Sequence, residues 1–169
     1  GAFQRLVNGQ AARFEGKNHA LVITRLGDMH RLSGDLERAR EVYQRAERIS
    51  GRQSTGKEAA VQNRGYRETC LSYLNQQRWP YLREKLLEWE SAFPTAKLEG
   101  DLTLIRGRYF QAIGQSERAA KEYRQLLKSR PRHASRPEIA FRLGQALVAS
   151  GEAEASKPWF KEVAEQYPN

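Results

Sequence analysis

Four segments of the chain repeat one another, and this self-similarity constrains the fold more than any other feature of the sequence. One column of the repeat holds a small residue within an apolar stretch, and its members are 43, 37 and 37 residues apart. That column is Gly27, Cys70, Gly107 and Gly144. A repeat of this length predicts a stack of supersecondary units, because one unit alone cannot bury its apolar face.

Further columns keep the same spacing and indicate that each unit is a pair of helices. Seven residues after the small residue comes a turn column: Gly34, Gln77, Gly114 and Gly151. A small and then a large residue follow one helical turn apart, so that both share one face of the second helix: Ala39 and Tyr43, Leu82 and Leu86, Ala119 and Tyr123, Ser156 and Phe160. The closing column, in which Pro ends the second helix, is Gly51, Pro94, Pro131 and Pro168.

These columns predict eight helices in four pairs. The pairs are expected near residues 18–33 and 36–49, 58–76 and 79–92, 97–113 and 116–129, and 135–149 and 153–166. A further helix is expected near residues 3–14, as an N-terminal cap or as the second helix of an earlier repeat. The second unit fits least well, because Cys70, Gln77 and Leu82 replace the usual small residues, and a distorted helix crossing is expected there. Pro158 is expected to delay or kink the last helix.

The columns resemble the tetratricopeptide repeat, whose pattern is a Leu-Gly pair in the first helix, an Ala-to-aromatic step in the second and a terminal Pro. The resemblance covers about residues 20–169 and implies an all-α fold, a right-handed superhelix of stacked antiparallel helix pairs. This superhelix is expected to contain about four helix-pair units plus an N-terminal helix. We expect one domain over residues 1–169, with a helix at 1–17 and helix pairs at 18–53, 58–96, 97–133 and 134–169.

The spacing and the unit endings resemble one branch of this superfamily more than others. The 37-residue period and the endings Phe93-Pro94, Arg130-Pro131 and Tyr167-Pro168 are similar to the bacterial envelope branch, including Tol-Pal coordinators and outer-membrane assembly lipoproteins. The cytosolic type has about 34 residues per repeat. Because no polar capping helix follows the last Pro, the natural protein is expected to continue beyond this segment.

Composition narrows the classes of function. No apolar run approaches the roughly 18 residues of a membrane-spanning helix. The net charge is +9, with 21 Arg and only 8 Lys, and the planar guanidinium suits carboxylates and phosphates. Arginines scattered over solvated helix faces would give the same count. The single Cys70 forms no internal disulfide, which leaves the bacterial periplasm or envelope and the cytoplasm both open.

No pattern in the sequence indicates catalysis, a cofactor or a metal site. Residues 51–58 approach a phosphate-binding loop, but Glu58 stands where a hydroxyl residue should hold magnesium. The three histidines are scattered rather than paired at ligand spacing. Trp79, Trp89 and Trp159 fall where large side chains pack between helices and are interpreted as core residues. We therefore expect no enzymatic activity from this segment.

The resemblance implies a binding groove on the concave face. In the family, positions three before, one after and four after the small column point into it. Carried onto this chain with the flanking arginines, they are Thr24, Arg25, Asp28, Arg31, Arg64, Arg67, Leu71, Leu74, Leu104, Arg108, Gln111, Phe141, Arg142, Gln145 and Val148. This set combines a basic stripe with an apolar strip, which suits a partner protein or peptide with acidic and apolar residues. Solvated charge on an exposed face is the plainer interpretation of the arginines.

Three functions remain open from the sequence. The family's best-known ligand is a C-terminal carboxylate held by Lys or Arg and Asn, but Asp28, Leu71 and Ile105 fill the Asn columns here. The first hypothesis is therefore a protein–protein interaction scaffold with a basic and apolar groove. The alternative is single-stranded nucleic-acid binding through the Arg-rich surface, although aromatics placed for base stacking are missing. The third is an accessory domain of an enzyme, and self-association is also open.

Overall fold

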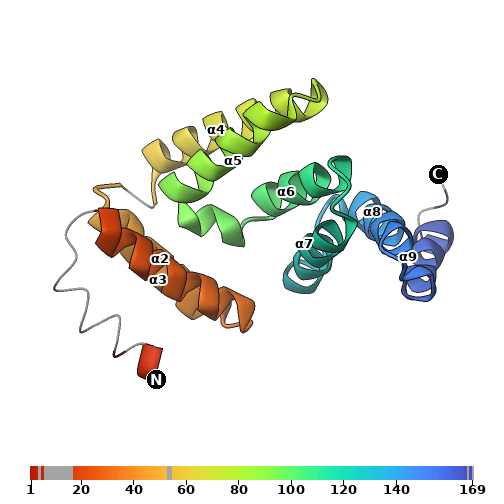
Figure 1. Ribbon diagram of the computed structural model, residues 1–169, viewed down its shortest axis with the longest axis horizontal. Coiled ribbons are helices and arrows are strands. Elements are labelled where there is room, and N and C mark those ends of the chain that lie inside the picture. Colours follow the sequence, from red (N-terminus) through yellow and green to blue (C-terminus); the bar gives the residue numbers. More distant parts are fainter. Residues whose placement is uncertain (4, 6–16, 53–54, 167, 169) are drawn as a thin grey trace. The chain divides into compact units, whose positions relative to one another are not determined.

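The structure, a computed structural model, describes residues 1–3, 5, 17–52, 55–166 and 168. All regular elements in these ranges are helices (Figure 1), which confirms the all-α prediction. They are α2 (Lys17–Leu32), α3 (Leu36–Ile49), α4 (Lys57–Asn75), α5 (Trp79–Ala92), the 3-10 helix η1 (Pro94–Leu98), α6 (Gly100–Ala112), α7 (Ser116–Ser129), α8 (Arg136–Ala149) and α9 (Ala153–Gln166). The helix expected near residues 3–14 lies largely outside the described residues.

The chain divides into two compact units. The first comprises residues 1–68 and 87–99, and the second comprises residues 69–86 and 100–169. The α4–α5 hairpin contributes its base to the first unit and its tip to the second. That residues 1–169 form one domain stays a prediction.

In the first unit, α2 and α3 pack closely because a glycine faces an aromatic ring. A Cβ atom on Gly27 would lie 2.4 Å from Cε1 of the buried Tyr43, so only glycine allows this approach. Ile23, Leu26 and Ala46 form the buried core beside this contact. Gly34, with a φ of 87°, makes the turn between the helices, and the Asp35 carboxylate caps α3 by accepting from the Arg38 N–H. The small residue of this repeat column thus allows the two helices to approach each other closely.

The connection between α5 and α6 differs from the sequence prediction. A helix was expected from residue 97, but α6 begins at Gly100 and a 3-10 helix precedes it. Pro94 fits the first position of a short helix, where no N–H partner is needed. The buried Glu47 of α3 accepts hydrogen bonds from the Thr95 N–H at 2.9 Å and the Thr95 hydroxyl at 2.6 Å. These contacts hold η1 against α3 in place of a regular first turn of α6.

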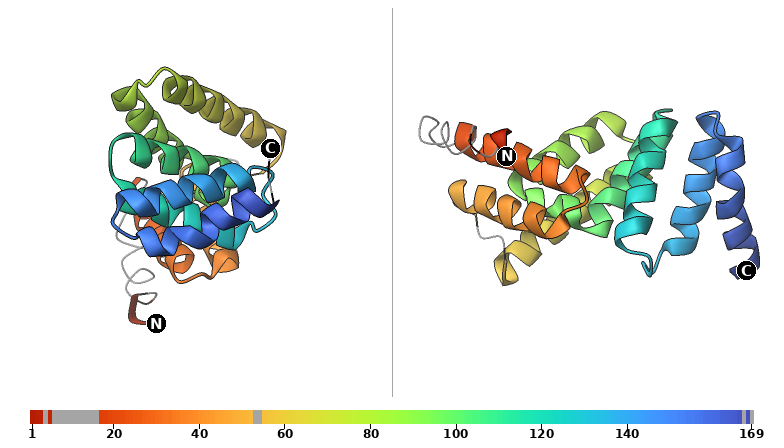
Figure 2. Two further views of the ribbon diagram at one scale, coloured as in Figure 1. Left: turned by 90° about the vertical axis from the view of Figure 1, so that its right-hand side faces the viewer. Right: turned by 90° about the horizontal axis from the view of Figure 1, so that it is seen from below.

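The second unit repeats the packing of the first. Helices α6 and α7 form one pair, α8 and α9 form the next, and α7 packs against α8 (Figure 2). A Cβ atom on Gly107 would lie 2.6 Å from Cε1 of Tyr123, and one on Gly144 would lie 2.7 Å from Cε1 of Phe160. Buried side chains of α7 and α8 fill the core between the pairs, among them Leu126, Ile139, Leu143 and Leu147.

Pro158 lies inside α9, which begins at Ala153 as predicted from the repeat. The expected delay of this helix is therefore wrong. The proline removes one N–H donor of the hydrogen-bond ladder, the one that would bond to the Glu154 carbonyl, and the helix continues through it. The alternative, a kink at Pro158, stays a prediction.

Candidate functional site

The first unit contains a half-buried polar network around the hydroxyl of Tyr43. This hydroxyl donates to Oδ1 of Asp28 at 2.6 Å and accepts from Nε of Arg31 at 3.3 Å. Nζ of Lys97, from η1, binds the same Asp28 oxygen at 2.8 Å and lies 5.6 Å from the centre of the Tyr43 ring. Arg25 pairs with the other Asp28 oxygen at 3.6 Å. The chain thus supplies a cation for its own carboxylate here.

These contacts change how both acidic groups titrate. Burial alone would raise the pKa of the Asp28 carboxyl, but hydrogen bonds from Lys97 and Tyr43, with the charges of Lys97 and Arg31, outweigh burial and lower it. Burial and the neighbouring Asp28 carboxylate raise the pKa of the Tyr43 hydroxyl. At neutral pH the network therefore holds a charged carboxylate and a neutral phenol.

Tyr123 occupies the same repeat column in the second unit, but its neighbours have different charges. Its hydroxyl donates to Oε1 of Gln111 at 2.9 Å, and Nε2 of Gln111 donates to Oε1 of Gln145 at 3.4 Å. Burial raises the pKa of Tyr123, against the opposing positive charges of Arg142 and Arg108. Arg108 stands in the column that Asp28 fills in the first unit.

A hollow of about 320 Å³ opens beside this tyrosine, within the second unit. It brings two cations together with amide and apolar side chains. Its lining residues are Leu74, Asn75, Gln77, Trp79, Arg108, Gln111, Ala112 and Arg142. Arg142 donates from Nε to Glu138 at 2.9 Å and keeps 29% of its side chain exposed. Within the described ranges, no carboxylate forms an ion pair with Arg108.

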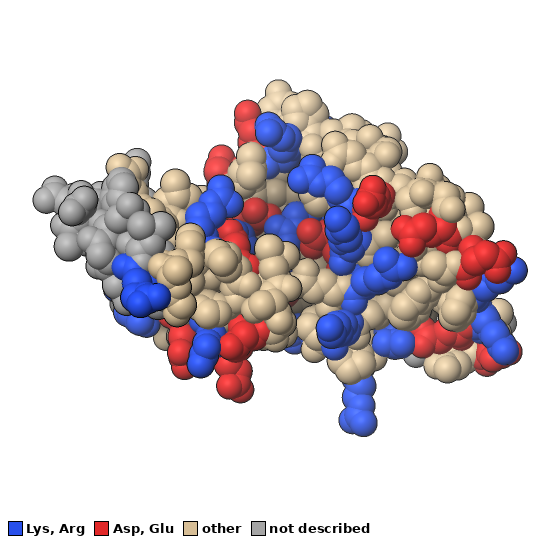
Figure 3. Space-filling model, turned by 60° about the horizontal axis from the view of Figure 1, so that its bottom comes forward, with Lys and Arg blue, Asp and Glu red and all other residues tan. Residues whose placement is uncertain are grey.

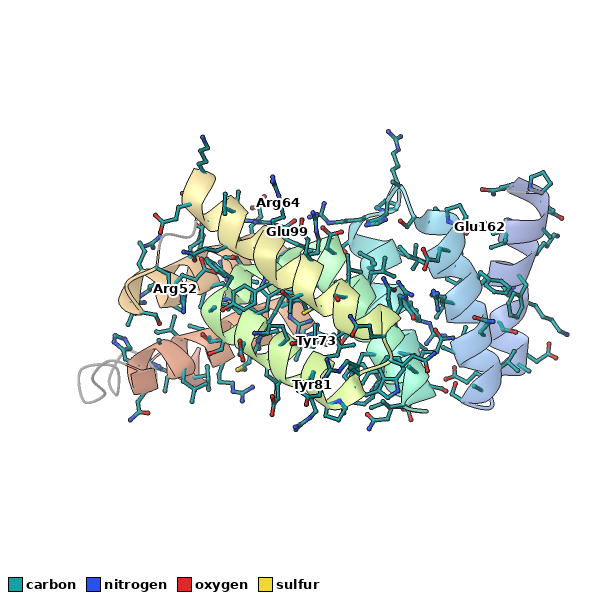
Figure 4. The ribbon with its side chains drawn as sticks, turned by 90° about the horizontal axis from the view of Figure 1, so that it is seen from above. Arg52, Arg64, Tyr73, Tyr81, Glu99 and Glu162 are labelled. Carbon is teal, nitrogen blue, oxygen red and sulfur yellow. The ribbon has the colours of Figure 1, made fainter. Side chains whose placement is uncertain are left out.

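The tip of the α4–α5 hairpin borders the hollow with a cluster of aromatic rings and a cation. The guanidinium carbon of Arg78 lies 4.2 Å from the centre of the Tyr81 ring and 5.8 Å from that of Tyr73. The two rings are 5.7 Å apart, at the same end of the hairpin (Figure 4). Gln77 makes the turn with a φ of 55°. An exposed cation stacked on aromatics is a common element of binding surfaces.

The predicted groove residues fall into two sets, one in each unit. The first unit holds Thr24, Arg25, Asp28, Arg31, Arg64 and Arg67, and the second holds Leu71, Leu74, Leu104, Arg108, Gln111, Phe141, Arg142, Gln145 and Val148. In the first set, the Thr24 hydroxyl donates to the Ala20 carbonyl of its own helix at 2.9 Å, and Arg64 is exposed on α4 (Figure 4).

In the second set, four predicted residues meet at the hollow: Leu74, Arg108, Gln111 and Arg142. Next to Arg142 on α8, Phe141 is 45% exposed and packs edge-on against Phe160, and Val148, nearer the end of the helix, is 51% exposed. Leu104 packs instead against the core.

Four lining residues were not predicted: Asn75, Gln77, Trp79 and Ala112. Trp89 is buried and Trp159 packs half-buried against the core, as expected, whereas Trp79, also half-buried, lines the hollow. Its place at the start of α5, next to the turn, puts it at the edge of the helix pair. The sequence did carry a signal, because Gln77 breaks the glycine column.

Basic side chains do not form one continuous field on the face drawn in Figure 3, where acidic side chains lie among them. Within the described ranges, His, Cys, Asp and Glu residues form no group large enough to hold a metal ion. No described helix combines the length and the apolar character that crossing a membrane requires.

Comparison with known families agrees with the observed packing. Residues 20–52 and residues 106–169 each match a tetratricopeptide-repeat family. The chain therefore carries tetratricopeptide repeats. Residues 53–105 lie outside both matches, and they include the α4–α5 hairpin with its unusual turn.

Solved structures of MamA have a similar fold. The structure of MamA AMB-1 is 17% identical with a TM-score of 0.51, covering 86% of this chain and 72% of that one. Two MamA mutants are each 18% identical: one has a TM-score of 0.52 over 86% of this chain and 96% of its own, and the other 0.51 over 92% and 75%. At these identities the similarity shows the fold alone. No curated protein sequence matches the chain.

Proposed function

We propose that the chain is a protein-interaction scaffold and that the hollow of the second unit binds an acidic and apolar segment of a partner protein. The observation that carries this proposal is that Arg108 of α6 and Arg142 of α8 line one hollow together with Leu74 and Trp79. A bound carboxylate would give Arg108 the opposite charge that the described residues do not supply. In this role the chain positions a partner and performs no reaction of its own.

The surroundings of the two arginines support a peptide rather than a small ion. Phe141 directly precedes Arg142 on α8, and Val148 lies less than two turns beyond Arg142. Both are half exposed, so an apolar side chain of a bound segment has a surface to cover. The Arg78, Tyr73 and Tyr81 cluster offers a rigid amphipathic surface on the other side of the turn.

The test is an array of capped peptides in which Asp or Glu and large apolar residues stand at varied spacings. Matched arrays replace the acidic residues by Lys or the apolar residues by Ser. Selected peptides are then titrated against the protein by fluorescence anisotropy. We expect binding to depend on both acidic and apolar residues, and to weaken at least about tenfold in the Arg108→Glu, Arg142→Glu variant.

A charge-matched control separates the site from net charge. The Lys128→Glu, Arg132→Glu variant changes the net charge equally at exposed positions that do not line the hollow. If both double variants lose binding equally, the hollow is not the site.

Nucleic-acid binding remains the alternative outcome. Steep weakening with salt and equal binding of random single-stranded oligonucleotides would favour it over a peptide. The mixed charges seen in Figure 3 favour the peptide. The 37-residue period also supports a place in the bacterial envelope branch of the repeat superfamily, and a partner from that compartment would agree with it.

A further inference from the structure

The turn between α4 and α5 has an unusual backbone. Gln77 has a φ of 55° and is the one residue other than glycine with a positive φ in the described part of the chain. The same repeat column holds Gly34, Gly114 and Gly151, with φ between 80° and 87°. A side chain disfavours this left-handed conformation, because its Cβ crowds the following carbonyl oxygen. A glycine would make the same turn without this strain.

The residue with the strained backbone also places its side chain in the hollow. Gln77 lines it between Asn75 and Trp79. The turn itself is fixed by backbone hydrogen bonds from the Gln77 N–H to the Leu74 carbonyl and from the Arg78 N–H to the Tyr73 carbonyl, at 3.1 and 2.9 Å. The direction in which the Gln77 side chain leaves the backbone is therefore set before any partner arrives. Strained residues that persist in folded proteins are often found at binding sites.

Few of the side chains that line the hollow can accept a hydrogen bond: only the carboxamides of Asn75, Gln77 and Gln111. Arg108, Arg142 and Trp79 only donate hydrogen bonds. Gln111 is already engaged, because its oxygen accepts from Tyr123 and its nitrogen donates to Gln145. The carboxamide of Gln77 both donates and accepts, and no described residue hydrogen-bonds to it. An extended peptide presents both an N–H and a C=O at each residue.

We infer that Gln77 determines specificity by binding a main-chain peptide group of the partner, while Arg108 and Arg142 bind the partner's acidic side chain. This inference rests on the proposed function. It adds that the partner lies in the hollow as an extended segment with an accessible N–H, because a helical segment has already used that N–H internally.

The test uses the peptide selected on the array, with each backbone nitrogen methylated in turn. Methylation removes one N–H donor and leaves the side chains unchanged. We expect one methylated position to weaken binding to the wild-type protein about tenfold. The peptide methylated at that position should bind the Gln77→Ala variant as tightly as the unmethylated peptide binds the same variant. Gln76→Ala is the matched control, since Gln76 is an exposed neighbour of the same type outside the hollow.

Gln77→Gly shows that lost binding does not reflect lost folding. This variant relieves the left-handed strain, so its melting temperature should rise while its affinity falls about as much as that of Gln77→Ala. The inference is overturned if either variant binds the peptide as tightly as the wild type, or if methylation costs Gln77→Ala as much as it costs the wild type. If the Arg108→Glu, Arg142→Glu variant also binds normally, the proposed function fails as well.

Discussion

The tyrosines of the two units occupy the same repeat column but have neighbours of opposite charge. Around Tyr43, an acidic residue stands one position after the small glycine, and Lys97 of the same chain neutralises it. Around Tyr123, the equivalent residue is Arg108, which has no ion pair to a described carboxylate. One network is complete within its own unit, and the other faces a hollow. The same framework therefore forms a structural contact in the first unit and borders a candidate binding site in the second, where Arg108 replaces Asp28 and Gln111 replaces Arg31.

The contact between a glycine and a tyrosine ring, which both units share, should be the most sensitive to substitution. Gly27→Ala and Gly107→Ala each force a Cβ against a buried tyrosine ring, and each should lower the free energy of unfolding by about 2–3 kcal/mol. Urea denaturation measures both. Gly65→Ala is the control, because a Cβ there meets nothing within 4 Å, and it should stabilise α4 by about 0.5 kcal/mol. A large loss at Gly27 with none at Gly107 would show that the two tyrosine contacts are not equivalent.

The charged residues beside the two tyrosines should contribute differently to stability in the two units. Lys97→Met leaves the Asp28 carboxylate half-buried without its closest cation and should cost about 2 kcal/mol of stability. Arg108→Met should change stability by less than about 0.5 kcal/mol, because Arg108 forms no ion pair with a described residue. Thermal and urea unfolding of both variants check the contrast. Equal losses would mean that Arg108 is a structural residue as well.

Removing the tyrosine hydroxyls sharpens the comparison further. Tyr43→Phe removes a donor to a charged carboxylate and should cost about 1.5 kcal/mol. Tyr123→Phe removes a donor to a neutral amide and should cost about 1 kcal/mol or less. The difference is measured by parallel denaturation, and a larger cost at Tyr123 would contradict the assignment of the stronger network to the first unit.

Two carboxylates of the first unit should give opposite pH dependences. The pKa of Asp28 is lowered from 3.8, so its contribution to stability is present above that pH and is lost as the pH falls through the folded-state pKa. Burial raises the pKa of Glu47 from 4.5, so stability is highest below that pH and falls as the pH rises through the raised pKa. Denaturation at a series of pH values gives the free energy of unfolding as a function of pH. Asp28→Asn should reduce the loss of stability at acid pH, and Glu47→Gln should reduce the loss that follows as the pH rises above 4.5. Unchanged profiles would show that neither carboxyl titrates as assigned.

The repeat columns predicted most of the fold because each column has a local cause. Helix ends agree with prediction to within one residue except at the start of α6. That exception depends on a tertiary contact, since Glu47 of α3 holds Thr95. No pattern near Pro94 reveals a partner so distant in sequence.

The candidate site could be predicted only in part. The family's groove positions named Leu74, Arg108 and Gln111, because regular columns place them on one face, and Arg142 was predicted as an arginine that flanks these positions. They did not name Gln77 or Trp79, which come from a turn where the sequence departs from the repeat. Nor could they show that Asp28 is neutralised by Lys97, since η1 itself was not predicted.

The contact of a glycine with an aromatic ring has a consequence for how such proteins evolve. Each ring is held by a helix backbone that approaches it closely, so its position does not depend on the charge of the neighbouring column. The same close packing is found beside Asp28 in the first unit and beside Arg108 in the second. Successive repeats can therefore differ in the charge of this column while they keep the same contact between glycine and ring.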